Sequence, residues 1–570
     1  MRTRLIVGLI PALLLAASRG VAAPPTLERV VARVADDSPL VVVVPSIDRL
    51  LEGLRAFGGA IGVDDLAKLD RAELLRDNFK LDTTAGIDQS GPLVMYGHPD
   101  DDGPVVLATL SDAGLWKRER AAEELADGVL KVSLGRDERY ASIEDDILVL
   151  APTEAHVRAA LKANGKTGAR VLKSCGEPLK KASAAFYADT EILRDTIGAG
   201  LAMGETFANM GVTAGGADPE MVTAMLRWGF EQLRRALDQS RVFTLVGRVS
   251  ADGVHFATAL RFATDSDVVR YLRTVKPPGA GPLAHPLPAD WAMLSGYDWM
   301  TDGSVPGLTD ALLKMLAAEL GAKGQTNPEQ LEKSLALAAE FNRKLTRVDQ
   351  VLWATDEGKT ASAMRCGGKH VRDIIHGFES YAELNQFMMR AWGLGGALTR
   401  TAGVERVGDV DARFSKTDFS TAAPEVARMM QSMYGPELVV YCAPLGDDAL
   451  MVTGGATVAK AELERFLKAG RKPAEPAAAL KSLFAELSPK PSAWMACNLR
   501  RMMDWLGGLT TAMGTPALFP KLPKDRDVFA ASAFYLDPDG VRVEVVVPSA
   551  AIKPLVEQAT DETSAGGDNM

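Results

Sequence analysis

Residues 181–195 read Lys-Ala-Ser-Ala-Ala-Phe-Tyr-Ala-Asp-Thr-Glu-Ile-Leu-Arg-Asp, and residues 490–504 read Lys-Pro-Ser-Ala-Trp-Met-Ala-Cys-Asn-Leu-Arg-Arg-Met-Met-Asp. Each stretch runs from a basic residue through a short apolar segment to a polar residue, Asp189 or Asn498. Such side chains cap helices by accepting hydrogen bonds from free backbone amides. Matched polar residues can also mark a paired active site, but capping is the simpler explanation. We therefore predict the same strand-to-helix unit twice.

Two further segments recur in both halves of the chain. Residues 145–150 correspond to 447–452, where an acidic turn precedes an apolar strand and then a helix. Val242-Phe243 corresponds to Val528-Phe529, and the pairs Asp252-Gly253 and Asp539-Gly540 follow. Asp-Gly between apolar runs predicts a tight hairpin, because Gly accepts a positive φ. Three matched segments in one order indicate an internal duplication.

The strands are predicted to come in hairpins, such as 92–97 with 104–110, which makes the sheets mainly antiparallel. Pro-Ser after the valine runs at 41–44 and 545–547 predicts that Ser46 and Ser549 cap helices. Asp218-Pro219-Glu220 predicts another helix start. The predicted fold is thus α+β, with two duplicated halves that are each a mainly antiparallel sheet covered by helices.

The predicted boundaries follow composition. Five prolines crowd the segment 276–289 and favour a stiff linker between the halves. The polar end of the chain favours disorder. The boundaries are a signal peptide at 1–23, a first half at 24–275, the linker at 276–289, a second half at 290–559 and a disordered tail at 560–570.

The N-terminus has the pattern of an export signal. Arg2 and Arg4 precede an apolar run at 5–17, and small residues at 21–23 offer a cleavage site. The run is shorter than the roughly 20 residues that span a bilayer, although an uncleaved anchor is the alternative. No later stretch has the pattern of a membrane span. We expect an exported, soluble protein in the periplasm, outside the cell or at the cell surface.

Charge narrows the choice of partners. Removal of Arg2, Arg4 and Arg19 with the signal reduces 64 Lys and Arg to 61, against 74 Asp and Glu. Nucleic-acid binding depends on basic clusters, so this balance predicts no nucleic-acid partner. It also disfavours simple attachment to anionic lipid.

The four cysteines permit disulfides in an exported protein. Cys442 and Cys497 both fall in strand-like runs, and neighbouring strands would allow them to bridge. The alternative is free, buried cysteine that acts as a small apolar residue.

The search for catalytic patterns gives no site. The six histidines form no His-Glu-x-x-His motif, and the chain contains no Gly-x-Ser-x-Gly elbow. A Gly-rich turn explains residues 366–370 as well as a metal site does, and residues 164–167 lack the first glycine of a phosphate loop. We predict no catalytic residue, no metal and no cofactor, while a hydrolase with an unrecognised site between the halves stays an alternative.

One feature suggests binding. After the first repeated segment, both halves continue into apolar stretches rich in small residues and methionine, which favour adaptable contact surfaces. We hypothesise that two apolar loops hold a hydrophobic small molecule or a partner protein; the alternative is that these residues are core. The candidate ligand-binding residues are Leu201, Met203, Phe207, Met210, Leu509, Met513, Leu518 and Phe519.

The run from Ser38 to Leu54, the segment 138–150 leading to Thr153-Glu154-Ala155-His156, and the closing Asp-Gly hairpin with Val-Pro-Ser together resemble an exported family of planctomycete-like and myxobacterial-like bacteria, a domain of unknown function. The resemblance implies export and an envelope setting, and it carries over no catalytic residue. The sequence thus favours a non-enzymatic binding or scaffolding protein of the cell envelope, whose partner is an envelope protein or a hydrophobic small molecule. A periplasmic carrier of a lipid or another hydrophobic ligand is the second possibility.

Overall fold

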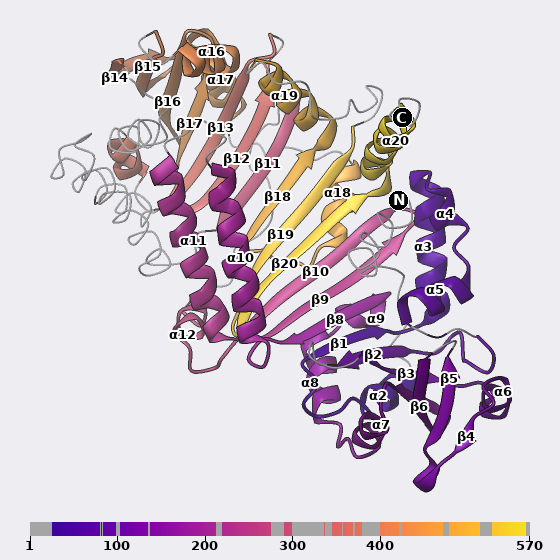
Figure 1. Ribbon diagram of the computed structural model, residues 1–570. Helices are drawn as coiled ribbons and strands as arrows, with labels where there is room; N and C mark the ends of the chain where they lie inside the picture. Colours follow the sequence, from indigo (N-terminus) through magenta and orange to yellow (C-terminus); the bar gives the residue numbers. More distant parts are fainter. Residues whose placement is uncertain are drawn as a thin grey trace. The chain divides into compact units, whose positions relative to one another are not determined.

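The structure is a computed structural model (Figure 1). It describes residues 25–79, 81, 84–97, 103–134, 137–212, 219–274, 290–298, 336, 345–355, 357–368, 371–378, 399–420, 424–470, 478–512 and 527–565. The chain forms two compact units. Unit 1 comprises Met1–Ile197, Asp238–Ala263 and Gly540–Met570, and unit 2 comprises Gly198–Leu237 and Thr264–Asp539.

The strands of unit 1 form an antiparallel sheet in the order β4-β5-β6-β7-β3-β2-β1-β8-β9-β10-β20. Their bounds are β1 Leu40–Val44, β2 Leu93–Gly97, β3 Val105–Thr109, β4 Glu123–Glu124, β5 Leu130–Leu134, β6 Asp137–Glu144, β7 Ile147–Ala151, β8 Ala184–Asp189, β9 Ser240–Ser250, β10 Gly253–Phe262 and β20 Gly540–Pro548.

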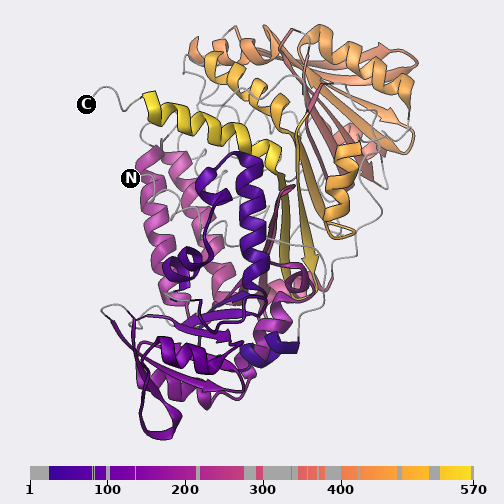
Figure 2. The same ribbon diagram turned by 90° about the vertical axis from the view of Figure 1, so that its right-hand side faces the viewer.

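Helices cover both faces of this sheet, because successive side chains on its strands enter two different cores. Leu93 belongs to the core that contains α3 and Val94 to the core that contains α2, as the alternation of a strand requires. Figure 2 shows the yellow α20, which contacts α3. The helices are α2 Pro25–Val31, α3 Ile47–Ile61, α4 Asp64–Ala67, α5 Arg71–Phe79, α6 Ala113–Glu119, α7 Glu154–Leu161, α8 Lys166–Cys175, α9 Pro178–Lys181 and α20 Ser549–Ala565, with a 3-10 turn at Ala126–Gly128.

Unit 2 has the antiparallel strand order β14-β15-β16-β17-β13-β12-β11-β18-β19. Its strands are β11 Trp291–Asp298, β12 Leu345–Ala354, β13 Thr360–Gly368, β14 Thr399–Val407, β15 Val410–Asp418, β16 Glu437–Leu445, β17 Asp448–Gly454, β18 Ala493–Asn498 and β19 Phe529–Asp537. Its helices are α12 Asp267–Leu272, a helix at 371–378, α16 Pro424–Tyr434, α17 Ala456–Ala469, α18 Ala478–Glu486 and α19 Leu499–Ala512, together with most of α10 Arg194–Val212 and α11 Pro219–Gln239.

The strands of the two units follow the same spatial order. Adding ten to each label from β4 to β9 in the first order gives the second order. The predicted α+β fold with two duplicated, mainly antiparallel halves is therefore confirmed. We call β1–β10 the first copy and β11–β20 the second copy. The repeated segments found in the sequence fall on β8 and β18 and on β7 and β17.

One alignment made from the sequence is wrong by a residue. Asp189 of β8 lies opposite Val242, and Asn498 of β18 lies opposite Phe529. Val242 therefore corresponds to Phe529 and not to Val528, a difference of 287 (529 − 242). Gly253 and Gly540 differ by the same amount (540 − 253), so the two Asp-Gly turns do correspond.

Within unit 1, the pairing of β10 with β20 has a local two-fold symmetry. Ala257 lies directly opposite Glu544, its own counterpart in the second copy, since 544 − 257 is again 287. A Cβ on Gly253 would approach the carbonyl oxygen of Val547 to 2.2 Å, and one on Gly540 would approach that of Leu260 to 2.4 Å. Both ends of the pair thus require glycine for the same steric reason.

Several local predictions are confirmed. The hairpin of β2 and β3 matches the one expected at 92–97 and 104–110, and α11 begins at Pro219. The helix α20 continues to Ala565, six residues into the segment expected to be a tail. The predicted signal peptide and the predicted linker lie outside the described residues.

Candidate functional site

The polar residues at the ends of the repeated strands are helix caps. The Asp189 carboxylate accepts hydrogen bonds from the backbone N–H groups of Glu191 at 3.1 Å and Ile192 at 3.3 Å. The Asn498 side-chain oxygen accepts one from the Arg501 N–H at 3.3 Å. The predicted capping role is confirmed, and each cap begins a chain segment that continues into a helix, α10 or α19.

An ion pair of reversed sign accompanies the two caps. Glu191 corresponds to Arg500, because their residue numbers differ by 309, as those of Asp189 and Asn498 do (500 − 191 and 498 − 189). Glu191 pairs with Arg241, whereas Arg500 pairs with Asp527 at 2.8 Å. The two pairs have opposite polarity, and their partners are offset by one residue, because Arg241 corresponds to Val528 and Asp527 to Ser240 (528 − 241 and 527 − 240).

The helices α10 and α11 form a hairpin in which they lie side by side (Figure 1). Arg234 Nη2 contacts Glu205 Oε2 at 2.5 Å, and a Cβ on Gly204 would lie 3.5 Å from the Phe230 ring. This hairpin is longer than the corresponding segment of the second copy. The residue numbers of matched positions differ by 309 before the hairpin and by 287 after it, so the first copy has 22 more residues between these strands (309 − 287). That excess is close to the 21 residues of α11.

Two large apolar side chains of the hairpin are exposed. Met203 is 61% exposed and Leu233 is 53% exposed. Among the described side chains between Gly198 and Leu237, only Leu237 is buried, while the other large apolar ones are half-buried: Leu201, Leu226, Trp228 and Phe230. A helix that packs on a core buries one apolar stripe, so these helices carry more apolar surface than their packing uses.

The corresponding helix of the second copy is held to its sheet. Trp505 Nε1 of α19 donates a hydrogen bond to Thr360 Oγ1 of β13 at 2.8 Å, and α19 contacts β11 and β12. Arg500 of α19 is buried. The described parts of the two copies therefore differ, since α10 and α11 each carry an exposed large apolar side chain and no such side chain is found among the described ones of α19.

The predicted ligand-binding residues divide into three groups. Leu201 and Met203 lie on this hairpin. Phe207 and Met210 lie in α10 and Leu509 lies in α19, so these segments are helices rather than the expected loops. The structure describes only the backbone of these three residues. Met513, Leu518 and Phe519 lie outside the described residues.

The predicted disulfide is wrong. Cys442 lies on β16 and Cys497 on β18, and four strands separate β16 from β18. Five strand spacings of about 4.8 Å separate them by roughly 24 Å, whereas a disulfide needs Cα atoms within about 7 Å. All four cysteines are free and buried, and burial raises the pKa of Cys175 and of Cys366 to about 12.

A chain of alternating charges crosses unit 2 and was not found from the sequence. Arg347 of β12 donates to Asp349 from Nε at 2.9 Å and from Nη2 at 3.1 Å, and the Asp349 side chain is 4% exposed. Arg365 of β13 lies opposite Asp349 and donates from Nε to Asp448 of β17 at 2.6 Å. Arg347 and Asp349 share a face because they are two residues apart on one strand, but only the register of the strands adds Arg365 and Asp448, so the sequence does not signal the network.

Two buried tyrosines in unit 1 were also missed from the sequence. Tyr96 and Tyr187 lie on either side of Val41 in one row of the sheet; the Tyr96 hydroxyl lies near the backbone of Ala35, and the Tyr187 hydroxyl has no hydrogen-bond partner among the described residues. Burial raises the pKa of Tyr187 to about 12 and that of Tyr96 well above its usual range. Both phenols thus stay protonated at neutral pH and are poorly suited to act as bases.

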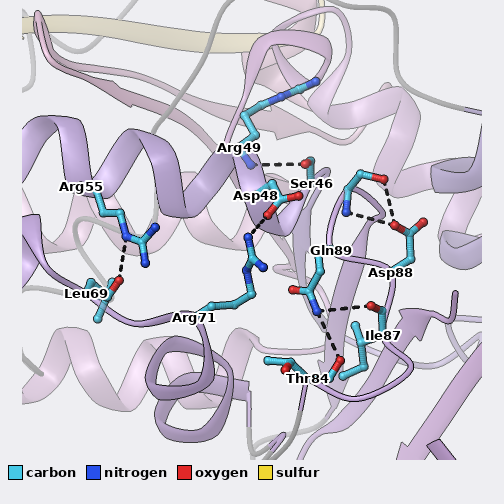
Figure 3. Close-up of polar contacts among 11 residues, drawn as sticks. Ser46, Asp48, Arg49, Arg55, Leu69, Arg71, Thr84, Ile87, Asp88 and Gln89 are labelled. Carbon is cyan, nitrogen blue, oxygen red and sulfur yellow. Dashed lines mark hydrogen bonds and ion pairs between the residues drawn. The ribbon is translucent and has the colours of Figure 1, made fainter. Parts of the chain in front are cut away.

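Figure 3 shows the polar contacts where α3 begins. Ser46 Oγ accepts a hydrogen bond from the Arg49 N–H at 3.3 Å, which confirms the predicted cap, and Asp48 pairs with Arg71. Gln89 Nε2 donates to the carbonyl oxygens of Thr84 and Ile87, both at 3.3 Å. These contacts fix the start of α3. Ser549, the other serine predicted to cap a helix, is the first residue of α20. Its hydroxyl donates a hydrogen bond to the carbonyl oxygen of Ala251 at 2.7 Å instead.

The described part of the chain holds no group of three or more His, Cys, Asp or Glu side chains arranged to bind a metal ion. None of the helices that the structure describes is long and apolar enough to cross a membrane.

No protein-family model matches this chain, and no curated protein matches it either. Solved structures that resemble it include crystal forms III, IV and I of TP0453. They share 8%, 9% and 8% sequence identity with the chain, cover 49%, 51% and 50% of it, and are themselves covered over 99%, 99% and 98% of their length. Their TM-scores are 0.19, 0.18 and 0.17, and a likeness at this level carries no argument about function.

Proposed function

We propose that this chain is an exported, non-enzymatic binding or scaffolding protein of the cell envelope, and that the α10–α11 hairpin contacts the partner. The observation that carries the proposal is the hairpin's apolar surface, in which Met203 and Leu233 are more than half exposed and Trp228 and Phe230 are only half-buried. Apolar surface of this kind is stabilised when a partner covers it.

Methionine and glycine make the surface adaptable. Met203 has a flexible side chain, and a Cβ added at Gly198, Gly200 or Gly229 would meet no heavy atom within 4 Å, so other groups can approach the helix backbones closely. The same properties suit an acyl chain, which keeps a carrier of lipid or another hydrophobic ligand as the second candidate.

A photo-crosslinking experiment in cells tests the proposal. A benzophenone amino acid replaces Met203 in one variant and Leu555, an apolar residue of α20 that is 43% exposed, in a matched control. We expect a protein adduct from position 203 that is lost when Leu233→Glu is added, and none from position 555. A lipid adduct at position 203, with displacement of cis-parinaric acid, would establish the carrier instead. No adduct specific to position 203 would contradict both functions, and recovery of the chain in the cytoplasm would contradict export.

A further inference from the structure

The strand β14 lies at one end of the unit 2 sheet. It pairs with β15 along all of Thr399–Val407, and with no other strand in the part of the chain that the structure describes (Figure 1). Its counterpart in the first copy, β4, consists of Glu123–Glu124 alone. A strand at a sheet edge carries backbone N–H and C=O groups that can pair with another chain. The second copy therefore keeps nine residues of this edge, and the first copy keeps two.

The charged side chains of β14 already have partners within the chain. The pairs are Glu405 with Lys460, Arg406 with Asp411, and Arg400 with the Ser415 hydroxyl. Val404, by contrast, is 62% exposed, the largest fraction among the exposed large apolar side chains described. Covering this apolar surface stabilises a complex, whereas the paired charges of the strand need no further counter-ion. The edge thus favours an uncharged contact centred on Val404.

The sequence of β14 fits a second molecule of this chain in one antiparallel register. A two-fold pair can place Val404 opposite Val404 of the other molecule, so that opposite residue numbers add to 808 (404 + 404). Glu405 then lies opposite Gly403, and Arg406 lies opposite Ala402. Each of these charged side chains meets a small residue, and the two exposed valines cover each other.

The neighbouring registers are less favourable. If Gly403 faced itself, Arg406 would lie opposite Arg400 of the other molecule at two places in the dimer. Like charges opposite one another destabilise strand pairing. If Ala402 faced itself, Val404 would lie opposite Arg400 instead of another apolar residue. The strand therefore favours the register in which Val404 pairs with itself.

The short β4 strand makes such a pair close on itself. Pairing of β14 with β4 of the next molecule would be head-to-tail and would build an open filament, but two residues offer few hydrogen bonds for it. The edge strands at the other side of each copy, β10 and β20, already pair with each other, and they do so antiparallel with a local two-fold symmetry. Among the described strands, β14 is the long edge that remains.

We propose that two molecules of this chain form a closed two-fold dimer through β14, with Val404 of one molecule against Val404 of the other. Main-chain hydrogen bonds join the two β14 strands into one continuous sheet, and the paired valines fix the register. This surface is distinct from the α10–α11 hairpin.

Light scattering of the full chain during gel filtration tests the proposal. We expect a dimer whose dissociation constant rises about tenfold or more in Val404→Lys, because this change sets two ammonium groups opposite each other. The matched control is Leu555→Lys, which changes an apolar residue of α20 that is 43% exposed and should leave the dimer unchanged. Both positions are exposed, so neither variant removes a core contact.

A cysteine at position 404 tests the register. Opposite residues of antiparallel strands have Cα atoms about 4.5–5.5 Å apart, which a disulfide can bridge. Val404→Cys should therefore give a covalent dimer on mild oxidation. Thr399→Cys should not, because residue 399 lies opposite residue 409 and its counterpart is ten residues (409 − 399), or about 34 Å, along the strand. The four native cysteines are buried and do not compete.

Several results would overturn the proposal. These are a monomeric wild type, a dimer that Val404→Lys leaves intact, equal crosslinking at positions 399 and 404, and oligomers that grow beyond two molecules. A dimer abolished by Met203→Glu but not by Val404→Lys would assign the contact to the α10–α11 hairpin. Crosslinking in cells at position 203 is a separate measurement, so the proposed function can hold when this proposal fails.

Discussion

Asp349→Ala should destabilise unit 2 more than any exposed charge change does. The wild-type carboxylate is 4% exposed and accepts two hydrogen bonds from Arg347, with Arg365 on the neighbouring strand. Removing it takes a carboxylate away from Arg347, whose side chain is 30% exposed, while Arg365 keeps its pair with Asp448. Breaking a fully buried pair costs about 3–5 kcal/mol, so we expect a loss at the lower end of that range here. With a urea dependence of about 3 kcal/mol per M, the unfolding midpoint should fall by about 1–2 M.

The control is Asp411→Ala, which removes an ion pair of similar length on the surface. The side chains of Asp411 and Arg406 are 69% and 61% exposed, and exposed pairs contribute about 1 kcal/mol or less. Urea unfolding of the full chain, followed by tryptophan fluorescence, should resolve unit 2, because Trp291, Trp353 and Trp494 lie in its core. Equal midpoint shifts for the two variants would refute the reasoning. Replacing Asp349 and Arg347 together by leucine and methionine should recover much of the loss.

Three further predictions concern a buried tyrosine, a buried cysteine and two glycines that lie close to the neighbouring strand. Tyr187→Phe should leave the free energy of unfolding unchanged or raise it by about 1 kcal/mol, because the hydroxyl has no partner among the described residues; a clear loss in a urea titration would show that it is hydrogen-bonded, for instance through an ordered water. Stability should fall as pH rises above about 9, because burial raises the pKa of Cys175 and of Cys366 to about 12 and the unfolded chain then releases protons that the native thiols keep; Cys175→Ala should make this dependence less steep, and a thiol reagent should reach the cysteines only on unfolding. Gly253→Ala and Gly540→Ala should each destabilise the chain by about 2 kcal/mol or more, since each Cβ would meet a carbonyl oxygen of the opposite strand at 2.2 or 2.4 Å, and Gly253→Ala should cost more because Gly253 also has a positive φ of 141°. The exposed helical change Gly200→Ala should be neutral or stabilising. Thermal melts in which Gly540→Ala is as stable as the wild type would contradict the close approach of the two strands.

The hairpin surface follows from burial rather than from sequence pattern. Met203 was identified from composition, but Leu233 and Trp228 were not, because α11 has the apolar spacing of an ordinary core helix. Only the tertiary packing shows that Leu237 of this stripe is buried while Leu233 is exposed. A composition-based search finds adaptable residues, and it cannot find the surface that packing leaves open.

The sequence alone determined the elements of this protein that depend on neighbouring residues. The cap at Asp189, the start of α11 at Pro219 and the turn at Gly253 follow from local backbone chemistry, and the copied segments around them fixed the duplication. Tertiary structure decided what strand register brings together: the charge network at Asp349 and the separation of Cys442 from Cys497. Local hydrogen bonds link residues a few positions apart, whereas a sheet joins residues a hundred positions apart, and one step in register sends a side chain to the other face.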